Sequence, residues 1–149
     1  MHVINIKPLK AYTDNYIWLL ETNEEVSVVD PGDAKPVLDY LSKTNKNLRD
    51  IFITHHHFDH TAGVPELENI ISGSIYGPKN SYELINEKVT QGDTLSSLGI
   101  KFEIIEVPGH TLDHIAFYNE ENNILFCGDT LFAGGCGRVF EGTFDQMFE

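Results

Sequence analysis

The sequence predicts a mixed α/β domain, because short apolar runs typical of strands alternate with segments of helical spacing. The apolar run at 51–53 contains two isoleucines and a phenylalanine, which favours a buried strand. By contrast, a helix is predicted to begin at Pro36, whose fixed φ suits a first turn, and to place Val37, Leu38 and Leu41 on one face. The hydrophobic periodicity predicts a mixture of helices and strands, and it does not predict how they are arranged.

The strand-like segments are apolar or alternate between apolar and polar residues. In chain order they lie near residues 2–6, 15–22, 25–29, 48–54, 74–77, 100–107, 114–119 and 122–128. A second helix is expected after Gly63, because Val64, Leu67, Ile70 and Ile71 recur at helical spacing. We therefore expect helices to connect some of the strands.

A dense histidine cluster follows the apolar run at 51–53. The string THHHFDH places His55, His57, Asp59 and His60 within six positions. Imidazole nitrogens and carboxylate oxygens coordinate zinc, iron and manganese, and a spacing of two turns His55 and His57 to the same side of an extended chain. A solvated histidine run is the alternative interpretation. The internal position of the cluster, after a strand expected to be buried, favours a metal site.

A second cluster, in the string VPGHTLDHIAF, contains His110 and His114. A Pro-Gly turn precedes His110, which places it at the end of a strand, where loops present functional groups. His114 differs because it opens an alternating strand and shares a face with Ala116 and Tyr118. We therefore interpret His114 as a hydrogen-bonded structural histidine.

Asp129 is a candidate metal ligand because it follows an apolar run and a glycine. Its two carboxylate oxygens could bridge a pair of metal ions. The string GDTL occurs twice in the chain, which provides an internal comparison. In the earlier copy, polar residues precede Asp93, so Asp93 is interpreted as a turn residue.

With these residues assembled, the chain resembles the metallo-β-lactamase superfamily, whose HxHxDH signature is matched between His55 and His60. The strings DPGDA, THHHFDHTAG, PGHTLDH and GDTLFAGGCGRVFEGT are similar to those of its glyoxalase II branch, the hydroxyacylglutathione hydrolases of bacterial type. The resemblance extends from Asp14 to the last residue. It implies a four-layer αββα sandwich, which periodicity does not predict by itself.

The resemblance also implies roles for individual residues. His55, His57 and His110 are expected to bind one metal ion, Asp59 and His60 a second, and Asp129 to bridge them. Zinc is the expected metal, with iron and manganese as alternatives. Asp59 and Asp129 are the expected catalytic residues, with Asp59 orienting the attacking water. Asp30 and His114 are expected beside the metal histidines as supporting residues that bind no metal.

Two residues near the end of the chain are expected to contact substrate. Arg138 follows a glycine-rich segment and matches a basic position that helps to hold glutathione, since a guanidinium suits a carboxylate. A solvated surface arginine is the alternative. Phe140 stands where eukaryotic members commonly have tyrosine, so this position cannot supply a phenol hydrogen bond.

The function implied by the resemblance is hydrolysis of S-D-lactoylglutathione, or of another S-2-hydroxyacylglutathione, to glutathione and a 2-hydroxy acid. This is the last step of methylglyoxal detoxification. In the implied mechanism, the metal ions activate water and polarise the thioester carbonyl. Two alternatives remain open: another enzyme of the superfamily, such as a mono-iron persulfide dioxygenase or a lactonase, and a truncated metal-binding domain with little activity.

The end of the chain sets a further expectation. The residues 143–146 form a capping-box pattern that should open a helix, but only three residues follow. Glyoxalase II proteins continue to a further metal histidine and a helical domain. We therefore expect the chain at 1–149 to be a truncated catalytic domain with an incomplete second metal site, weak activity and an αββα sandwich that is incomplete at its C-terminus. Association of such a chain is possible, although family members are monomers.

Composition narrows the choice of partners. The formal net charge of −13 gives no basic surface for tracking phosphates and argues against a nucleic-acid partner. No stretch has the length and apolarity of a membrane span, and the N-terminus lacks the pattern of a signal peptide.

Cys127 and Cys136 lack CxxC spacing, which favours free thiols over a disulfide or a zinc site. The expected location is the cytoplasm.

Overall fold

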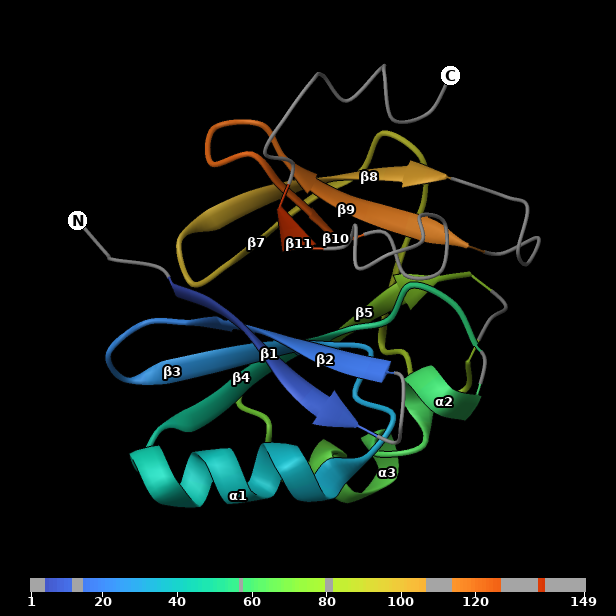
Figure 1. Cartoon of the computed structure of the whole chain (residues 1–149). Helices are drawn as coiled ribbons and strands as arrows, with labels where there is room; N and C mark the ends of the chain where they lie inside the picture. Colours follow the sequence, from blue (N-terminus) through green and yellow to red (C-terminus); the bar gives the residue numbers. More distant parts are fainter. Residues whose placement is uncertain are drawn as a thin grey trace.

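Strand pairing builds two sheets that lie one above the other (Figure 1). The computed structural model describes residues 5–11, 15–56, 58–79, 82–106, 114–126 and 137–138. The first sheet has six strands in the order β1-β2-β3-β4-β5-β6, and the second has five in the order β11-β10-β9-β8-β7. Helices α1 and α3 lie on the side of the first sheet that faces away from the second (Figure 1).

The elements have the following bounds in chain order: β1 Asn5–Ala11, β2 Asn15–Glu21, β3 Glu25–Val29, α1 Ala34–Thr44, β4 Asn47–Phe52, α2 Phe58–Thr61, α3 Val64–Leu67, the 3₁₀ turn η1 Glu68–Ile70, β5 Ile75–Pro78, β6 Glu87–Val89, β7 Thr94–Ser97, β8 Ile100–Glu106, β9 Ile115–Asn119, β10 Ile124–Phe126 and β11 Gly137–Arg138. Strands β3 to β6 pair in parallel, whereas β1 to β3 and the whole second sheet pair antiparallel.

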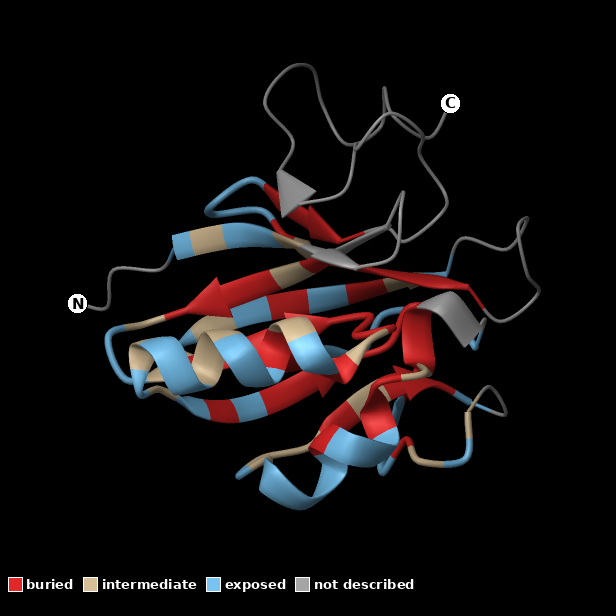
Figure 2. Cartoon of the chain, turned by 60° about the horizontal axis from the view of Figure 1, so that its bottom comes forward, coloured by how far each residue is buried: buried red, intermediate tan, exposed pale blue. Residues whose placement is uncertain are grey.

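The central strands β3 and β4 of the first sheet have apolar neighbours on both faces, which explains why β4 ends in a continuous apolar run. Phe52 faces the second sheet, where its ring stacks on Phe117 at 4.9 Å and meets Phe102 edge-on at 5.4 Å. Ile51 and Ile53 pack on the opposite side, against the helices. Helix α1 buries only its inner side, as the alternation of colours in Figure 2 shows.

Local signals set the ends of α1. The side chain of Asp33 caps the first turn by accepting a hydrogen bond from the Lys35 N–H at 3.1 Å. Asn45 ends the helix in the left-handed conformation, with φ of 57°. The helix therefore begins at Ala34, two residues before the predicted start at Pro36.

The prediction of a mixed α/β fold is confirmed, and β3 has the predicted bounds of 25–29. The described residues form three layers of the expected αββα sandwich, and they include no helix on the outer face of the second sheet. The pattern at 143–146 and the predicted strand beyond 126 lie outside the described residues. Nor do the described ranges contain any helix of the length and apolarity that a membrane crossing requires.

Several sequence predictions are wrong in detail. The first strand continues to Ala11 instead of ending at residue 6, because Pro8 is tolerated on an edge strand and does not stop the pairing with β2, while residues 2–4 of the predicted strand lie outside the described residues. Leu38 is 37% exposed, since α1 turns Ala34, Val37 and Leu41 toward the sheet instead. The second helix is also shorter than predicted.

The helical spacing after Gly63 holds for Val64 and Leu67, which are both buried. The chain then changes to a 3₁₀ turn at Glu68, which leaves Ile70 45% exposed. Sequence patterns also missed β6, β7 and β11, which are short and largely polar. These strands form by pairing with longer neighbours.

The interpretation of Asp93 as a turn residue is confirmed. Its carboxylate accepts a hydrogen bond from the Thr90 N–H at 2.9 Å, and its own N–H donates to the Thr90 carbonyl at 2.9 Å. Gly92 between them has φ of 87°, which favours glycine. Asp93 therefore closes the turn into β7.

A buried carboxylate at the end of β2 joins the first sheet to α1. Glu21 is 1% exposed and forms ion pairs with Lys7 and Lys46, each at 3.0 Å, and it accepts a hydrogen bond from the Tyr40 hydroxyl. Burial alone would raise the pKa of Glu21, but the hydrogen bonds from these three partners lower it below its ordinary value of 4.5. The carboxylate is therefore charged and satisfied in the folded state.

We predict that Glu21→Gln lowers the free energy of unfolding by about 1.5–3 kcal/mol at neutral pH, the range for hydrogen bonds to charged groups. Because the folded-state pKa of Glu21 lies below 4.5, its contribution is complete above about pH 4.5 and is lost as the pH falls through the folded-state value. Denaturant unfolding of both proteins at several pH values should show the difference shrinking in acid.

Glu25→Gln is the matched control, since Glu25 forms a more exposed ion pair with Arg49 at 3.6 Å. This substitution should change stability by less than about 0.5 kcal/mol. A Glu21→Gln protein as stable as the parent at neutral pH would contradict the assignment.

Candidate metal centre

Parallel pairing of β3 with β4 brings the candidate site together. Val29 lies opposite Phe52 in the register, so the residues that follow these strands emerge at the same edge of the sheet. Asp30 follows β3, and Thr54 and His55 follow β4. The Asp30 N–H donates to the Phe52 carbonyl at 2.8 Å, which continues the pairing into the site.

Asp30 is a buried hydrogen-bond acceptor with an unusual backbone conformation. It is 5% exposed and has φ of 50°, in the left-handed region that aspartate tolerates better than most residues. Its Oδ1 accepts from the Thr54 N–H at 2.8 Å, and its Oδ2 accepts from the Thr54 hydroxyl at 2.6 Å and lies 2.9 Å from His60 Nδ1. Burial alone would raise the pKa of Asp30, but the imidazoles of His60 and His55 and the Thr54 hydroxyl lower it below 3.8.

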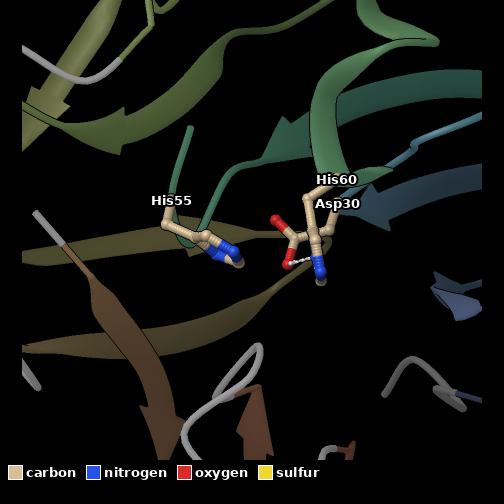
Figure 3. A group of neighbouring side chains, drawn as sticks. All are labelled: Asp30, His55 and His60. Carbon is tan, nitrogen blue, oxygen red and sulfur yellow. Dashed lines mark hydrogen bonds and ion pairs between the residues drawn. The ribbon is translucent and has the colours of Figure 1, made fainter. Parts of the chain in front are cut away.

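Two buried histidines from different segments converge beside this carboxylate (Figure 3). His55 follows β4 and His60 lies in α2, and their ring centroids are 4.4 Å apart. Each ring is held by its Nδ1 atom: that of His55 lies 2.9 Å from the Thr54 hydroxyl, and that of His60 lies 2.9 Å from Asp30. Both rings are therefore fixed in orientation.

The three side chains have the composition of a metal site. One potential ligand atom from each of Asp30, His55 and His60 lies within 4.8 Å of the others. The oxygens of Asp30 already accept from Thr54 and from the Nδ1 side of His60. Asp30 is thus placed to orient the histidines by hydrogen bonds. The two imidazoles are better candidate metal ligands than this carboxylate.

His114 is buried against His55. It is 1% exposed, and the two rings stack with centroids 4.5 Å apart and planes 17° apart. The neighbouring Ile115 N–H donates to the Thr54 carbonyl at 3.0 Å, which joins the start of β9 to the end of β4. His114 thus covers one face of the His55 ring, and the second sheet is attached at this point.

The other predicted site residues are only partly described. His57, His110, Asp129 and Phe140 lie outside the described residues. The backbone of Asp59 lies in α2 beside His60, and the backbone of Arg138 pairs with Ile124 in the second sheet. For these two residues the structure describes the backbone position alone.

Sequence reasoning missed Thr54, the residue that contacts both Asp30 and His55. Thr54 is fully buried at the end of the apolar run of β4. A buried hydroxyl must find hydrogen-bond partners, and that requirement was the available signal. One of its partners, however, is Asp30, which follows β3 and lies 24 residues earlier in the chain, so no local pattern identifies it.

The comparisons with known proteins agree with this geometry. A family model described as "Metallo-beta-lactamase superfamily" matches residues 13–148. The chain belongs to the metallo-β-lactamase superfamily. A crystal structure of the BLEG-1 B3 metallo-β-lactamase superposes on this chain with a TM-score of 0.77 and a sequence identity of 21%. The superposition covers 90% of this chain and 76% of that chain, which shows that the two proteins share a fold.

Curated relatives are closer in sequence. The chain is 50% identical to a hydroxyacylglutathione hydrolase from Pseudoalteromonas translucida, over 98% of this chain and 58% of the relative. It is also 50% identical to a hydroxyacylglutathione hydrolase from Chromohalobacter salexigens, over 97% of this chain and 58% of that relative. The chain therefore spans somewhat more than half the length of these proteins.

Membership of the superfamily implies a divalent metal ion, and the described residues fit one. The Nδ1 atoms of both imidazoles are engaged, so each Nε2 is the atom left to coordinate. Both Nε2 atoms are buried, and no hydrogen bond reaches them from the residues that the structure describes. Nitrogen donors in this state suit zinc and iron.

The position of α2 and His60 depends on a glycine. Gly63 lies against the turn after β3, where its N–H donates to the Pro31 carbonyl at 2.9 Å. A Cβ atom at Gly63 would lie 2.6 Å from both the Pro31 oxygen and the Ala34 nitrogen, and 2.7 Å from the Asp33 carbonyl carbon. These contacts are all with backbone, so no side chain can move aside to relieve them.

We predict that Gly63→Ala lowers the free energy of unfolding by about 1–3 kcal/mol, the usual cost of overpacking. It should also weaken metal binding, because the contact holds the segment that carries His60 against the Asp30 turn. Denaturant unfolding and competition with a chromogenic chelator for zinc measure the two effects.

Gly92→Ala is the control, since Gly92 has a left-handed φ of 87° but no atom within 4 Å of the added Cβ. It should cost about 1–2 kcal/mol of stability through backbone strain and leave zinc affinity unchanged. Equal zinc affinity in the Gly63→Ala protein would show that this contact does not position the site.

Proposed function

We propose that the chain is the metal-binding catalytic domain of a hydroxyacylglutathione hydrolase, over residues 1–149. The reaction is hydrolysis of an S-2-hydroxyacylglutathione, such as S-D-lactoylglutathione, to glutathione and a 2-hydroxy acid. The observation that carries the proposal is 50% identity to hydroxyacylglutathione hydrolases over nearly the whole chain. The buried pair of imidazoles beside Asp30 supports it.

The proposed ligands are those that the motifs predict. His55, His57 and His110 are assigned to one zinc ion, Asp59 and His60 to a second, and Asp129 to both. Iron or manganese could replace zinc with the same donor set. When bound, such a metal supplies Lewis acidity, which lowers the pKa of coordinated water to about 7 and polarises a carbonyl.

The protein's own side chains orient the histidine ligands and exclude solvent from the site. Asp30 and Thr54 hold the imidazoles of His60 and His55 by hydrogen bonds, and His114 covers the His55 ring. Asp59 is assigned to orient the attacking water. The departing thiolate is a good leaving group, so this reaction requires general acid catalysis less than amide hydrolysis does.

Arg138 is assigned to the glutathione carboxylate, beside Phe140. The surrounding protein is acidic, with a net charge of −13, so an anionic substrate requires local positive charge from the metal ions and this arginine. The acidic composition also argues against a nucleic-acid partner. We propose a cytoplasmic location and, as in the family, a monomer, with association of the chain at 1–149 as the alternative.

The metal assignment predicts that the purified chain contains zinc, iron or manganese, and that His55→Ala loses most of it. His2→Ala is the matched control, because His2 is the one histidine outside the two motif clusters. Elemental analysis after expression with added metal provides the measurement. A parent chain that binds none of these metals would refute the assignment.

The substrate assignment predicts that the metal-loaded chain hydrolyses S-D-lactoylglutathione faster than β-lactams and faster than the metal-free chain. Arg138→Ala should raise KM by about 10- to 100-fold, the equivalent of one charged hydrogen bond, with a smaller change in kcat. Asp129→Ala should abolish turnover. These constants come from initial rates of thioester cleavage.

Arg49→Ala is the control for Arg138, because these are the two arginines in the chain and Arg49 forms a partly exposed ion pair with Glu25. It should leave KM unchanged. Normal kcat in the Asp129→Ala protein would exclude the bridging role. Oxidation of a persulfide by an iron-loaded chain, without thioester hydrolysis, would favour a persulfide dioxygenase instead.

A further inference from the structure

Thr54 uses all its polar groups within the candidate metal centre. Its N–H donates to Asp30 Oδ1 at 2.8 Å, and its carbonyl accepts from the Ile115 N–H at 3.0 Å. Its hydroxyl donates to Asp30 Oδ2 at 2.6 Å and lies 2.9 Å from His55 Nδ1. Thr54 is fully buried, so water cannot replace these partners.

The number of available protons determines the direction of each bond. The Thr54 hydroxyl has one hydrogen, and it is used in the bond to Asp30. Toward His55 the same oxygen can therefore only accept, so His55 Nδ1 must carry a hydrogen and its Nε2 must carry the lone pair. His60 Nδ1 also faces Asp30 Oδ2, which leaves the lone pair of His60 on Nε2.

We propose that Thr54 is a positioning residue that extends the orienting effect of Asp30 to His55. One carboxylate then sets the tautomer and ring direction of two histidines, His60 directly and His55 through the threonine hydroxyl. This inference rests on the proposed function, in which both histidines bind metal through Nε2. It adds a role for a residue that is not itself a ligand.

The arrangement explains why the hydroxyl is on this side chain. Valine has nearly the same shape as threonine and suits the end of a buried strand, so packing alone does not require an oxygen here. The hydroxyl contacts two groups of the site and joins segments that follow β3 and β4. His114 stacks on the His55 ring and restricts its plane, whereas Thr54 determines which nitrogen carries the proton.

The test compares Thr54→Val, which removes the hydroxyl, with Thr54→Ser, which keeps it. Side-chain ¹⁵N NMR of the metal-free protein at about pH 8, where ordinary imidazoles are neutral, reports the tautomer of each histidine. We expect the Nδ1–H tautomer at His55 in the parent and in Thr54→Ser. In Thr54→Val we expect a mixture that includes the Nε2–H form.

Zinc affinity, measured by chelator competition, is the second measurement. Substitution of residues that orient metal ligands costs about 10- to 100-fold in metal affinity, and we expect a loss of this size in Thr54→Val. Thr54→Ser should restore affinity to within about threefold of the parent, because the orienting hydroxyl is present.

Ser97→Ala is the matched control. Ser97 is also a buried hydroxyl that donates to a buried carboxylate, that of Asp50, at 2.7 Å, but this pair lies outside the metal centre. Its removal should lower stability without changing the His55 tautomer or zinc affinity. Thermal unfolding of each protein separates general loss of stability from the specific effect.

Three outcomes distinguish the possibilities. An Nε2–H tautomer at His55 in the parent would overturn the inference without any variant, even if Thr54→Val fails to fold. A folded Thr54→Val protein with the parent tautomer and parent zinc affinity would also overturn it. A parent chain that shows the Nδ1–H tautomer but binds no zinc would refute the proposed metal ligands and support the hydrogen-bond relay.

Discussion

The parallel register between β3 and β4 is the constraint on which the candidate site depends. Val29 lies opposite Phe52, and the Phe52 ring is fixed between the two sheets by Phe102 and Phe117. Because side chains alternate along a strand, a slip of one residue would turn Phe52 out of this core. Apolar packing therefore specifies the register, and the register places Asp30 beside Thr54.

Burial of polar groups at this strand edge requires compensation. Asp30 combines a buried carboxylate with a left-handed backbone, and both features are unfavourable by themselves. Hydrogen bonds from Thr54 and His60 offset them. The second buried aspartate of the first sheet, Asp50, accepts instead from Ser97 and from the Ser74 N–H. Among the described residues, the hydrogen-bond partners of Asp50 include no histidine, so that network joins strands.

The sequence predicted the parts of the fold and site that depend on local pattern. Strand β3 and the clustering of His55 with His60 follow from apolar runs and residue spacing. The role of Thr54 does not follow from local pattern, because it depends on Asp30, which lies 24 residues earlier in the chain. The spacing predicts the wrong face for Leu38, because helical spacing alone does not determine which of two adjacent stripes meets the sheet. The short strands β6 and β7 were missed because pairing with neighbours stabilises them more than their own composition does.

The candidate centre also lies where the second sheet joins the first. The Ile115 N–H donates to the Thr54 carbonyl, and His114 stacks on His55, so the start of β9 contacts the same two residues that the Asp30 network orients. A change in the docking of β9 would therefore displace the backbone of Thr54 and, with it, the hydroxyl beside His55 Nδ1. Because the histidines converge only in the folded chain, metal binding by the proposed ligands would stabilise that state by a free energy that grows with the logarithm of the metal affinity. On the proposed ligand assignment, the attachment of the second sheet and the affinity for metal are linked through Thr54, which is not itself a ligand.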